Sequence, residues 1–406
     1  MTPAPPRTPR RAWLPVALTM FAIGWGANQF VSLLVAYRER SGFSVSTVDA
    51  LVGAYALGLI PALLVLGPIS DRRGRTPVLR AAALVSLAAT AVLMIGDLWA
   101  LYAGRLLAGL ASGAAFAAGS AWVEELSTAR WDPAAREGAG ARRAAMSLTA
   151  GFCLGPVVAG LLAQWAPDPL VTAYLPHLVV VLAVLGPLWR APETVDPARV
   201  SPAAGSPLAR LRVRSASDPR FRRSVAPVAP WVFGAATVSI AVLPGLVTDT
   251  TAGWTVAFSA LIAGVTLGTG FLVQPTARRI AAASPRRGVV CGLVAVVVGL
   301  GIAAAAAATT SPWLVAPAAV VLGTGYGCCL VSGLIQTQRI AAPGELAGLT
   351  AVYYALTYVG FAAPVLLALL AMLLPYWVLL LGAAALAALT LAVAVTAPRE
   401  GALSAR

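Results

Sequence analysis

Apolar runs of about 18 or more residues recur along the whole chain, and each is long enough to cross the roughly 30 Å hydrocarbon core of a bilayer. Of the 406 residues, 59% are hydrophobic and only 11% are charged, whereas a soluble domain carries about 25% charged residues. Because backbone polar groups in lipid must be satisfied within each segment, the runs are predicted to be helices. The pattern therefore predicts an all-α, multi-pass membrane protein.

Twelve spans are predicted, in two groups of six. They cover residues 12–37, 47–67, 78–96, 98–124, 142–165, 170–190, 224–248, 254–274, 288–309, 312–337, 346–373 and 376–397. A polar segment rich in Pro, Ser and Arg separates the sixth span from the seventh. We therefore expect an N-terminal six-helix bundle over 1–190, a cytoplasmic linker over 191–223 and a pseudo-symmetric C-terminal bundle over 224–406. Because the first apolar run is too long for a signal peptide, no cleaved leader is expected.

The basic residues predict the orientation of the chain. All 29 are arginines, and with a cytoplasmic N-terminus 26 of them lie in inner segments, while the outer loops hold Arg38 and Arg40. This bias is the positive-inside pattern, and it predicts that both termini face the cytoplasm. The net charge of +14 alone would suit nucleic acid, but the arginines are spread over every inner segment. No nucleic-acid partner is therefore expected, and the spacing of the four cysteines predicts no metal site.

A polar loop of special composition, GPISDRRGRTPVL, joins the second and third spans at 67–79. A glycine near a helix end, Gly67, permits close helix packing. The acid Asp71 is suited to pair with Arg72 or Arg75 or to accept hydrogen bonds from a helix N-terminus. Gly74 allows the tight reversal of the chain. A short polar turn with topogenic arginines explains the same residues.

Three stretches together resemble the signature motifs of the major facilitator superfamily. The first is this loop, with matches at Gly67, Asp71, Arg72, Gly74, Arg75 and Leu79. The second is LYAGRLLAG at 101–109, with matches at Arg105 and Gly109 and a departure at Ala108, where Gln is usual. The third lies in the fifth span, with matches at Gly151, Gly155, Pro156 and Gly160 and with Ala159 in place of a Gly. The resemblance implies two six-helix bundles that alternate access to a central cavity.

The third motif resembles that of the drug and metabolite antiporters with twelve helices. Its glycines predict a smooth helix face for close contact, and Pro156 predicts a bend whose freed carbonyl stays away from water. We therefore expect a packing or gating role for Gly151, Gly155, Pro156 and Gly160. An ordinary Gly/Pro kink is the alternative, since both residues are frequent in membrane helices.

A substrate cavity is predicted from polar and aromatic residues. By resemblance, spans 1, 4, 7 and 10 line it, with spans 2, 5, 8 and 11 beside them. Arg105 is the ionisable residue well inside a span, and it is expected either to organise the binding site or to serve packing. The candidate cavity residues are Trp25, Asn28, Gln29, Tyr55, Arg105, Phe116, Trp231, Tyr326, Gln336, Tyr353, Tyr354 and Tyr358. Aromatic walls with few charges suit a lipophilic or amphipathic substrate.

Proton coupling needs a titratable group in or near the membrane. Asp49, Glu124 and His177 are the candidates, although helix capping explains Asp49 and a structural role near the outer end of the sixth span explains His177. Glu124 and Glu125 close the fourth span, where they are expected to pair with Arg75, Arg142 or Arg143 and hold the inner gate shut. A solvated helix end explains these two acids nearly as well.

The chain is therefore predicted to be a secondary transporter of a bacterial inner membrane, most simply a proton-coupled exporter. An importer or facilitator of a sugar or organic acid is the alternative, because residues do not display direction. A membrane enzyme would need clustered acids, histidines or metal ligands, and a receptor would more often carry a sizeable soluble domain. Without lysine there is no ATP-binding loop. The expected partners are a small molecule, a proton or another ion, and lipid; no cofactor or metal is expected, and the protein is expected to be a monomer.

Overall fold

The computed structural model describes residues 11–136, 138–195, 213–342 and 345–396. Among these residues, twelve helices are long and apolar enough to cross a membrane. They are Trp13–Ser41, Val45–Arg73, Arg75–Leu93, Leu98–Glu125, Ala139–Trp165, Pro169–Trp189, Phe221–Leu246, Thr255–Ala283, Pro285–Thr309, Pro312–Ile340, Gly348–Leu370 and Tyr376–Thr396. The prediction of an all-α chain with twelve spans is confirmed. Its termini and most of the expected linker lie outside the described residues.

Two spans run further than the hydrophobic pattern predicted. The second was expected to end at residue 67, but α3 (Val45–Arg73) continues through the polar loop. The eighth was expected to end at residue 274, but α12 (Gln274–Ala283) follows α11 (Thr255–Leu272) directly. A hydropathy pattern marks only the part of a helix that lies in lipid, whereas backbone hydrogen bonding continues into a polar extension.

Several spans change helix type along their length. The first consists of α1 (Trp13–Asn28), a 3₁₀ turn at Gln29–Leu33 and α2 (Leu34–Ser41). The fourth has a π-helical turn at Ala115–Gly119 between α5 (Leu98–Ala114) and α6 (Ser120–Glu125). The seventh has α10 (Ala229–Thr237) followed by a π-helical turn at Val238–Val242. Such turns redirect side chains and are frequent at functional sites.

The chain divides into two compact units. The first holds Met1–Phe30, Ala54–Ala159 and Pro167–Ala204, and the second holds Val31–Gly53, Gly160–Ala166 and Gly205–Arg406. The second unit thus includes α2, the start of α3 and the last turns of α7 (Ala139–Trp165). The two predicted bundles have simpler boundaries than these units, and they stay a prediction.

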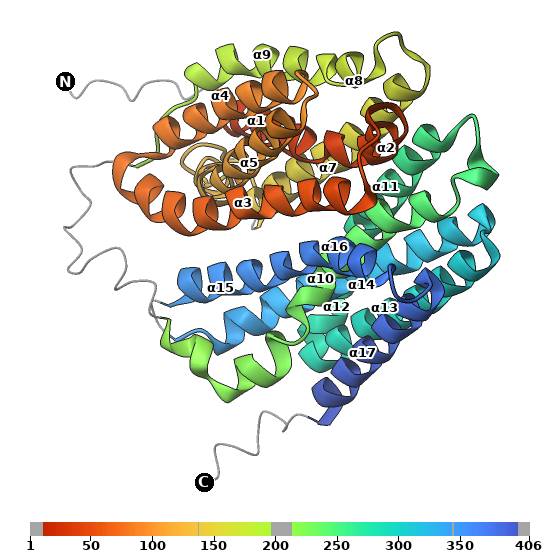
Figure 1. The fold of residues 1–406 in the computed structure, drawn as a ribbon. Helices are drawn as coiled ribbons and strands as arrows, with labels where there is room; N and C mark the ends of the chain where they lie inside the picture. Colours follow the sequence, from red (N-terminus) through yellow and green to blue (C-terminus); the bar gives the residue numbers. More distant parts are fainter. Residues whose placement is uncertain (1–10, 137, 196–212, 343–344, 397–406) are drawn as a thin grey trace, which may run out of the picture. The chain divides into compact units, whose positions relative to one another are not determined.

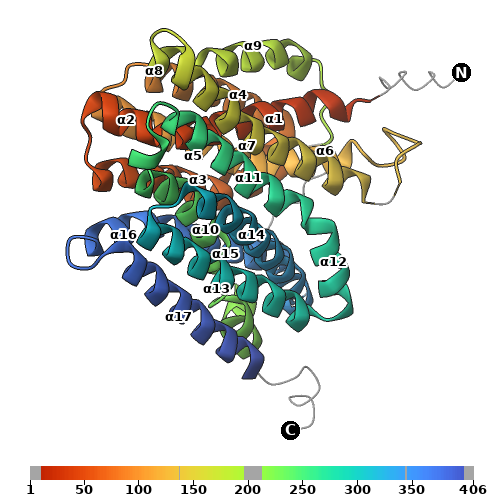
Figure 2. The same cartoon turned by 90° about the vertical axis from the view of Figure 1, so that its right-hand side faces the viewer.

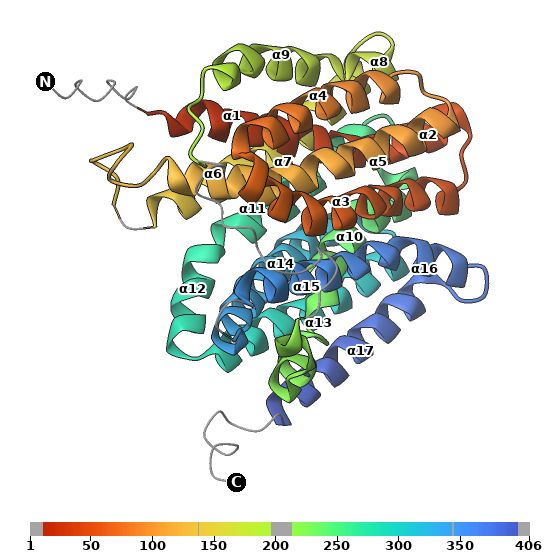
Figure 3. The ribbon, with the colours of Figure 1, turned by 90° about the vertical axis from the view of Figure 1, so that its left-hand side faces the viewer.

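In the first unit, α1 packs against α9 (Leu175–Trp189) and α5, and α4 (Arg75–Leu93) packs against both α5 and α9 (Figure 3). A short helix, α8 (Pro169–Thr172), precedes α9. Two glycines one turn apart, Gly109 and Gly113, bring α5 onto α3. A Cβ on Gly113 would lie 2.6 Å from Leu59 O, and one on Gly109 would lie 2.8 Å from Leu59 N. Small residues allow this backbone contact, which stabilises helix pairs in lipid.

In the second unit, α13 (Pro285–Thr309) packs against both α14 (Pro312–Ile340) and α17 (Tyr376–Thr396), as Figures 1 and 2 show. α14 also contacts α10 and α11. The eleventh span consists of α15 (Leu346–Tyr358), a 3₁₀ turn at Val359–Ala362 and α16 (Ala363–Leu370).

Candidate functional site

A charged cluster surrounds the guanidinium of Arg75 at the start of α4. Its Nη2 lies 2.8 Å from Glu125 Oε1 at the end of α6, and its Nη1 donates to Asp71 and to Ser70 Oγ on α3. Gly74, between α3 and α4, has a φ of +103°, a backbone angle that residues with a side chain rarely adopt. One buried arginine therefore joins three helices of the first unit at the turn that the sequence singled out.

A carboxylate from the segment after α9 caps the first turn of α4. Glu193 Oε1 accepts from the backbone N–H of Arg75 at 3.0 Å, and Oε2 accepts from that of Thr76 at 2.8 Å. Gly74 at the N-cap has no side chain to cap the helix, so Glu193 satisfies N–H groups that lack intrahelical partners. Burial would raise the pKa of Glu193, but N–H donors from Val195, Thr76 and Arg75 hold that pKa below its usual value.

The same segment also contacts α6. The hydroxyl of Thr194 donates to Glu125, and the indole N–H of Trp122 donates to Pro192 O at 3.0 Å. Residues 192–194 therefore connect the start of the linker to α4, which carries Arg75, and to α6, which carries its partner Glu125.

Glycines bring α7 into backbone contact with α1. A Cβ on Gly155 would lie 2.6 Å from Trp25 O, and one on Gly24 would lie 2.7 Å from Leu148 O. A side chain at Gly151 would collide with Phe21 O. α7 continues as one helix through Pro156. The glycines of the third motif therefore permit a close helix pair.

Arg105 is almost fully buried inside the first unit, with 1% of its surface exposed. Its Nη1 donates to Ala27 O at 2.8 Å, near the end of α1. Its guanidinium lies 4.9 Å from the ring centre of Phe30 and 4.8 Å from that of Tyr55, which are cation–π distances. These contacts join α5 to α1 and α3 and give Arg105 a clear packing role.

A chain of hydrogen bonds leads from His177 to Gln29. His177 Nε2 lies 3.0 Å from Ala22 O, Nδ1 lies 2.7 Å from Thr90 Oγ1, and Gln29 Nε2 donates to the same hydroxyl at 3.0 Å. Because a carbonyl can only accept, Nε2 carries the proton and Nδ1 of a neutral ring accepts from Thr90. His177 is fully buried near the start of α9, and the three hydrogen-bonded side chains come from three different spans.

Four aromatic rings meet in the second unit. The ring centre of Phe233 on α10 lies 5.8 Å from that of Tyr326, 4.6 Å from that of Tyr358 and 5.4 Å from that of Phe361. Both tyrosines are buried, while the two phenylalanines are half-buried. This aromatic cluster combines side chains from the seventh, tenth and eleventh spans, and it contains two of the predicted cavity residues.

A buried acid lies near the start of α3, also in the second unit. Asp49 is 4% exposed, and its carboxyl interacts electrostatically with Arg38 on α2 and with Tyr376 at the start of α17. The Arg38 guanidinium lies against Gly245 at the end of the seventh span, 2.7 Å from where a Cβ would be. The carboxyl of Asp49 is therefore buried near the side chains of Arg38 and Tyr376 and is not exposed to solvent.

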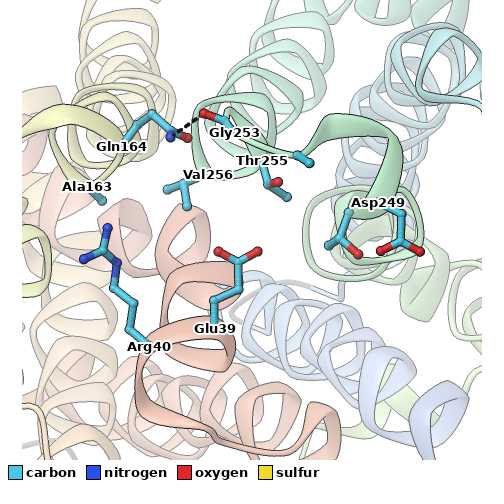
Figure 4. Close-up of a pocket in the computed structure, with 10 residues that line it drawn as sticks. Glu39, Arg40, Ala163, Gln164, Asp249, Gly253, Thr255 and Val256 are labelled. Carbon is cyan, nitrogen blue, oxygen red and sulfur yellow. Dashed lines mark hydrogen bonds between the residues drawn. The ribbon is translucent and has the colours of Figure 1, made fainter.

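A pocket of about 360 Å³ lies in the second unit, and the end of α2 and the start of α11 line it. Figure 4 shows Glu39 and Arg40 extending from α2 toward the first turn of α11, with Asp249 on the other side. Gln164, in the last turn of α7, reaches Gly253 at the rim of the pocket.

The sequence profile of the Major Facilitator Superfamily matches residues 16–364. The chain belongs to this superfamily. It is 30% identical over 217 residues to the multidrug efflux pump LfrA of Mycolicibacterium smegmatis, a match that spans 48% of this chain and only 39% of that relative.

Solved structures of transporters share the fold at low sequence identity. The nucleoside transporter NupG matches with a TM-score of 0.72 and 11% identity over 94% of this chain and 99% of NupG. A POT family transporter solved with 5-aminolevulinic acid matches with a TM-score of 0.74 and 13% identity over 95% of each chain. The human organic anion transporter MFSD10 matches with a TM-score of 0.66 and 19% identity over 96% of this chain and 100% of MFSD10.

The predicted site residues of this superfamily member fall in several places. Trp25 is buried and Asn28 half-buried on α1, and Phe116 lies in the π-helical turn 6.0 Å from Phe152. The indole of Trp231 donates to Thr390 on α17.

Three more predicted residues belong to the tenth and eleventh spans. Gln336 is buried near the end of α14, and Tyr354 is half-buried. The hydroxyl of Tyr353 donates to Cys329 O and Leu330 O on α14.

Some expected pairings at the inner end have other partners. Asp71 pairs with Arg75, whereas Arg72 is half-exposed. Arg143 pairs with Asp132 at 2.8 Å and not with Glu124 or Glu125.

Two further residues of the inner end differ from expectation. Glu124 is exposed and packs against Gly140, and a Cβ on Gly67 would lie 3.5 Å from the Cβ of Ala117, which is an ordinary contact distance. Neither residue therefore belongs to the cluster around Arg75.

Three functional candidates were missed by sequence reasoning. Glu193 is an acid in an inner segment rich in arginine, a signal similar to the one that marked Asp71. Gln164 is a polar residue in the last turn of an apolar span. The sequence does not distinguish Phe233, because apolar rings are common in membrane helices and only its neighbours in the structure make it notable.

Proposed function

We propose that the protein is a secondary active transporter that works by alternating access and exports a small lipophilic or amphipathic compound in exchange for protons. The glycine face of α7 carries this proposal. Its motif resembles that of the antiporter branch, and Gly151 and Gly155 form backbone contacts with α1. The similarity to a multidrug efflux pump supports the same direction.

The aromatic cluster supports a lipophilic substrate. Phe233 and Phe361 leave part of their rings exposed beside two buried tyrosines. Aromatic faces bind apolar rings and attract organic cations. We assign this cluster of the second unit to substrate binding. Trp25, Asn28 and Phe116 stay predicted substrate residues of the first unit. Arg105 then acts mainly by holding α1, α3 and α5 in place, through its bonds to Ala27, Phe30 and Tyr55.

The charged cluster around Arg75 is the proposed inner gate. Asp71, Glu125 and Glu193 converge on the turn between α3 and α4, so a change at this turn is transmitted to α6 and to the start of the linker. Gly74 supplies the backbone conformation that the turn needs. Gly67 and Arg72 flank this cluster without a direct bond to Arg75 among the contacts described above.

The coupling proton is assigned among Asp49, Glu124 and His177 by their surroundings. Glu124 is exposed, and both ring nitrogens of His177 have partners within the first unit. Asp49 combines burial with a neighbouring arginine, Arg38, whose charge changes the balance between its protonated and ionised forms. Asp49 is therefore the group whose substitution should most affect coupling.

We place the protein in a bacterial cytoplasmic membrane as a monomer with both termini inside. The distribution of arginines carries the orientation, because the inner segments of the proposed topology hold nearly all of them. On this topology the cluster around Arg75 faces the cytoplasm, and Gln164 faces the outside.

Transport in proteoliposomes with a trapped pH dye tests the proposal. A pH gradient is imposed, and lipophilic cations, antibiotics, sugars and organic acids are added one at a time. Substrate-dependent proton efflux that Arg105→Ala and Asp71→Asn weaken, and that Arg73→Ala in the same loop leaves unchanged, is the expected result. Flux of a labelled sugar or organic acid without proton movement would favour the importer or facilitator and exclude the antiporter.

A further inference from the structure

The first turn of α11 lacks a capping side chain of its own. Trp254 occupies the N-cap position and makes no side-chain hydrogen bond to the helix. The first N–H groups of a helix have no intrahelical partner, and leaving one unsatisfied away from water is costly. In this protein the missing partner of Ala257, the third residue of α11, comes from another span.

Gln164 on α7 provides that partner with both ends of its amide. Its Oε1 accepts from Ala257 N–H at 3.1 Å, and its Nε2 donates to Gly253 O at 3.0 Å. The two partners are a donor and an acceptor, and a carboxamide satisfies both because it carries an acceptor oxygen and a donor N–H group. Gly253 has a φ of +86°, which fixes the turn that presents its carbonyl.

One turn earlier on the same face of α7, the helices touch without side chains between them. A Cβ on Gly160 would collide with the Cβ of Ala260 on α11 and would lie 3.2 Å from the Cβ of Ser32 in the first span. Gly160 and Gln164 are four residues apart, so they share one helix face. The contact therefore joins the fifth and eighth spans, and at Gly160 it includes the first.

The pocket of Figure 4 brings solvent to this contact. Gln164, Gly253 and Val256 line it, together with Glu39 and Arg40. When Gln164 moves away, water can form hydrogen bonds with Ala257 N–H and Gly253 O. Separation therefore loses two hydrogen bonds within the protein but leaves no buried polar group without a partner.

We propose that Gln164, with Gly253 and Ala257, is a latch that holds the fifth and eighth spans together at one end, where α7 finishes and α11 begins. When this end opens, the amide of Gln164 leaves the first turn of α11, Gly160 separates from Ala260, and Ser32 becomes exposed to water. The inference rests on the proposed alternating access and names the residue that regulates one of its gates.

Hydrogen–deuterium exchange of the full-length protein in lipid nanodiscs tests the latch without substrate or gradient. Gln164→Leu removes both hydrogen bonds, so it should raise exchange about thirtyfold in peptides covering 254–262 and 29–36. Gln164→Glu keeps an acceptor for Ala257 N–H and should give a smaller rise. Gln274→Leu is the matched control. It lies further along the eighth span, at the start of α12, and should leave both peptides unchanged.

The peptide around Ser32 decides between a latch and a local cap, because Ser32 lies beside Gly160 and its exchange depends on separation of the spans. A rise confined to 254–262 would overturn the latch. Gly160→Ala is the second variant, since its methyl group collides with Ala260, and it should raise exchange in both peptides. Gly268→Ala, whose Cβ meets nothing within 4 Å, is its control. Failure of proton-coupled transport with these exchange results intact would overturn the proposed function and leave the latch.

Discussion

Replacing Gly151 by alanine tests whether the third motif serves close helix contact. A Cβ at this position would collide with Phe21 O and lie 2.7 Å from Trp25 N, both of them backbone atoms of α1 that cannot rotate away. Overpacking of this kind costs about 1–3 kcal/mol. Alanine is preferred to glycine inside a helix by about 1 kcal/mol. We therefore expect Gly151→Ala to lower the free energy of unfolding by about 1 kcal/mol, although alanine forms helices better than glycine.

The free energy of unfolding, measured by denaturation with SDS in mixed micelles, provides the assay. Gly301→Ala on α13 is the matched control, because a Cβ there meets nothing within 4 Å. That variant should be more stable than the wild type by up to about 1 kcal/mol, so the two alanines should change stability in opposite directions. If Gly151→Ala is as stable as Gly301→Ala, α1 and α7 are not in backbone contact and the packing role of the motif is refuted.

Three further outcomes are expected. Glu193→Gln should lower stability by about 1 kcal/mol at pH 7, the usual value of a helix cap. Because the pKa of Glu193 is held below its usual value, this contribution is present above about pH 4.5 and is lost as pH falls through the folded pKa, so wild type and variant should converge in acid. Arg105→Lys keeps the charge but loses the planar contact with Phe30 and Tyr55, and it should cost about 2 kcal/mol in the same denaturation assay. Phe233→Ala should raise the KM for a transported lipophilic cation about tenfold with little change in maximal rate, whereas Trp313→Ala on the exposed surface should change neither.

The spans themselves were predictable because lipid permits few backbone solutions. Each long apolar run became a helix, and the glycine positions of the motifs were identified before their contacts were known. The ends of the helices were harder, since α3 and α12 continue into polar sequence that a hydropathy pattern does not separate from a loop.

The candidate sites were only partly predictable, because pairing depends on helix rotation and on distant segments. The sequence suggested Arg75 as a partner of Asp71, which lies only four residues earlier, near the end of α3. It did not suggest Glu193, which follows Arg75 by more than a hundred residues and caps α4 from the linker side. Arg105 was notable as a buried charge, but only the structure shows its guanidinium against two rings of the same unit.

Two kinds of contact hold these helices together, and they differ in how easily they can be remade. Backbone contacts at Gly109 and Gly151 fill space completely, and neither water nor lipid can replace them without leaving a void. The amide of Gln164 instead joins polar groups at the rim of a solvent-accessible pocket, where water offers equivalent hydrogen bonds. The helix pairs joined at Gly109 and Gly151 should therefore move as one body, whereas the end held by Gln164 can separate at small cost. In a transporter that alternates access, this difference favours motion at the latch over motion within the glycine-packed pairs.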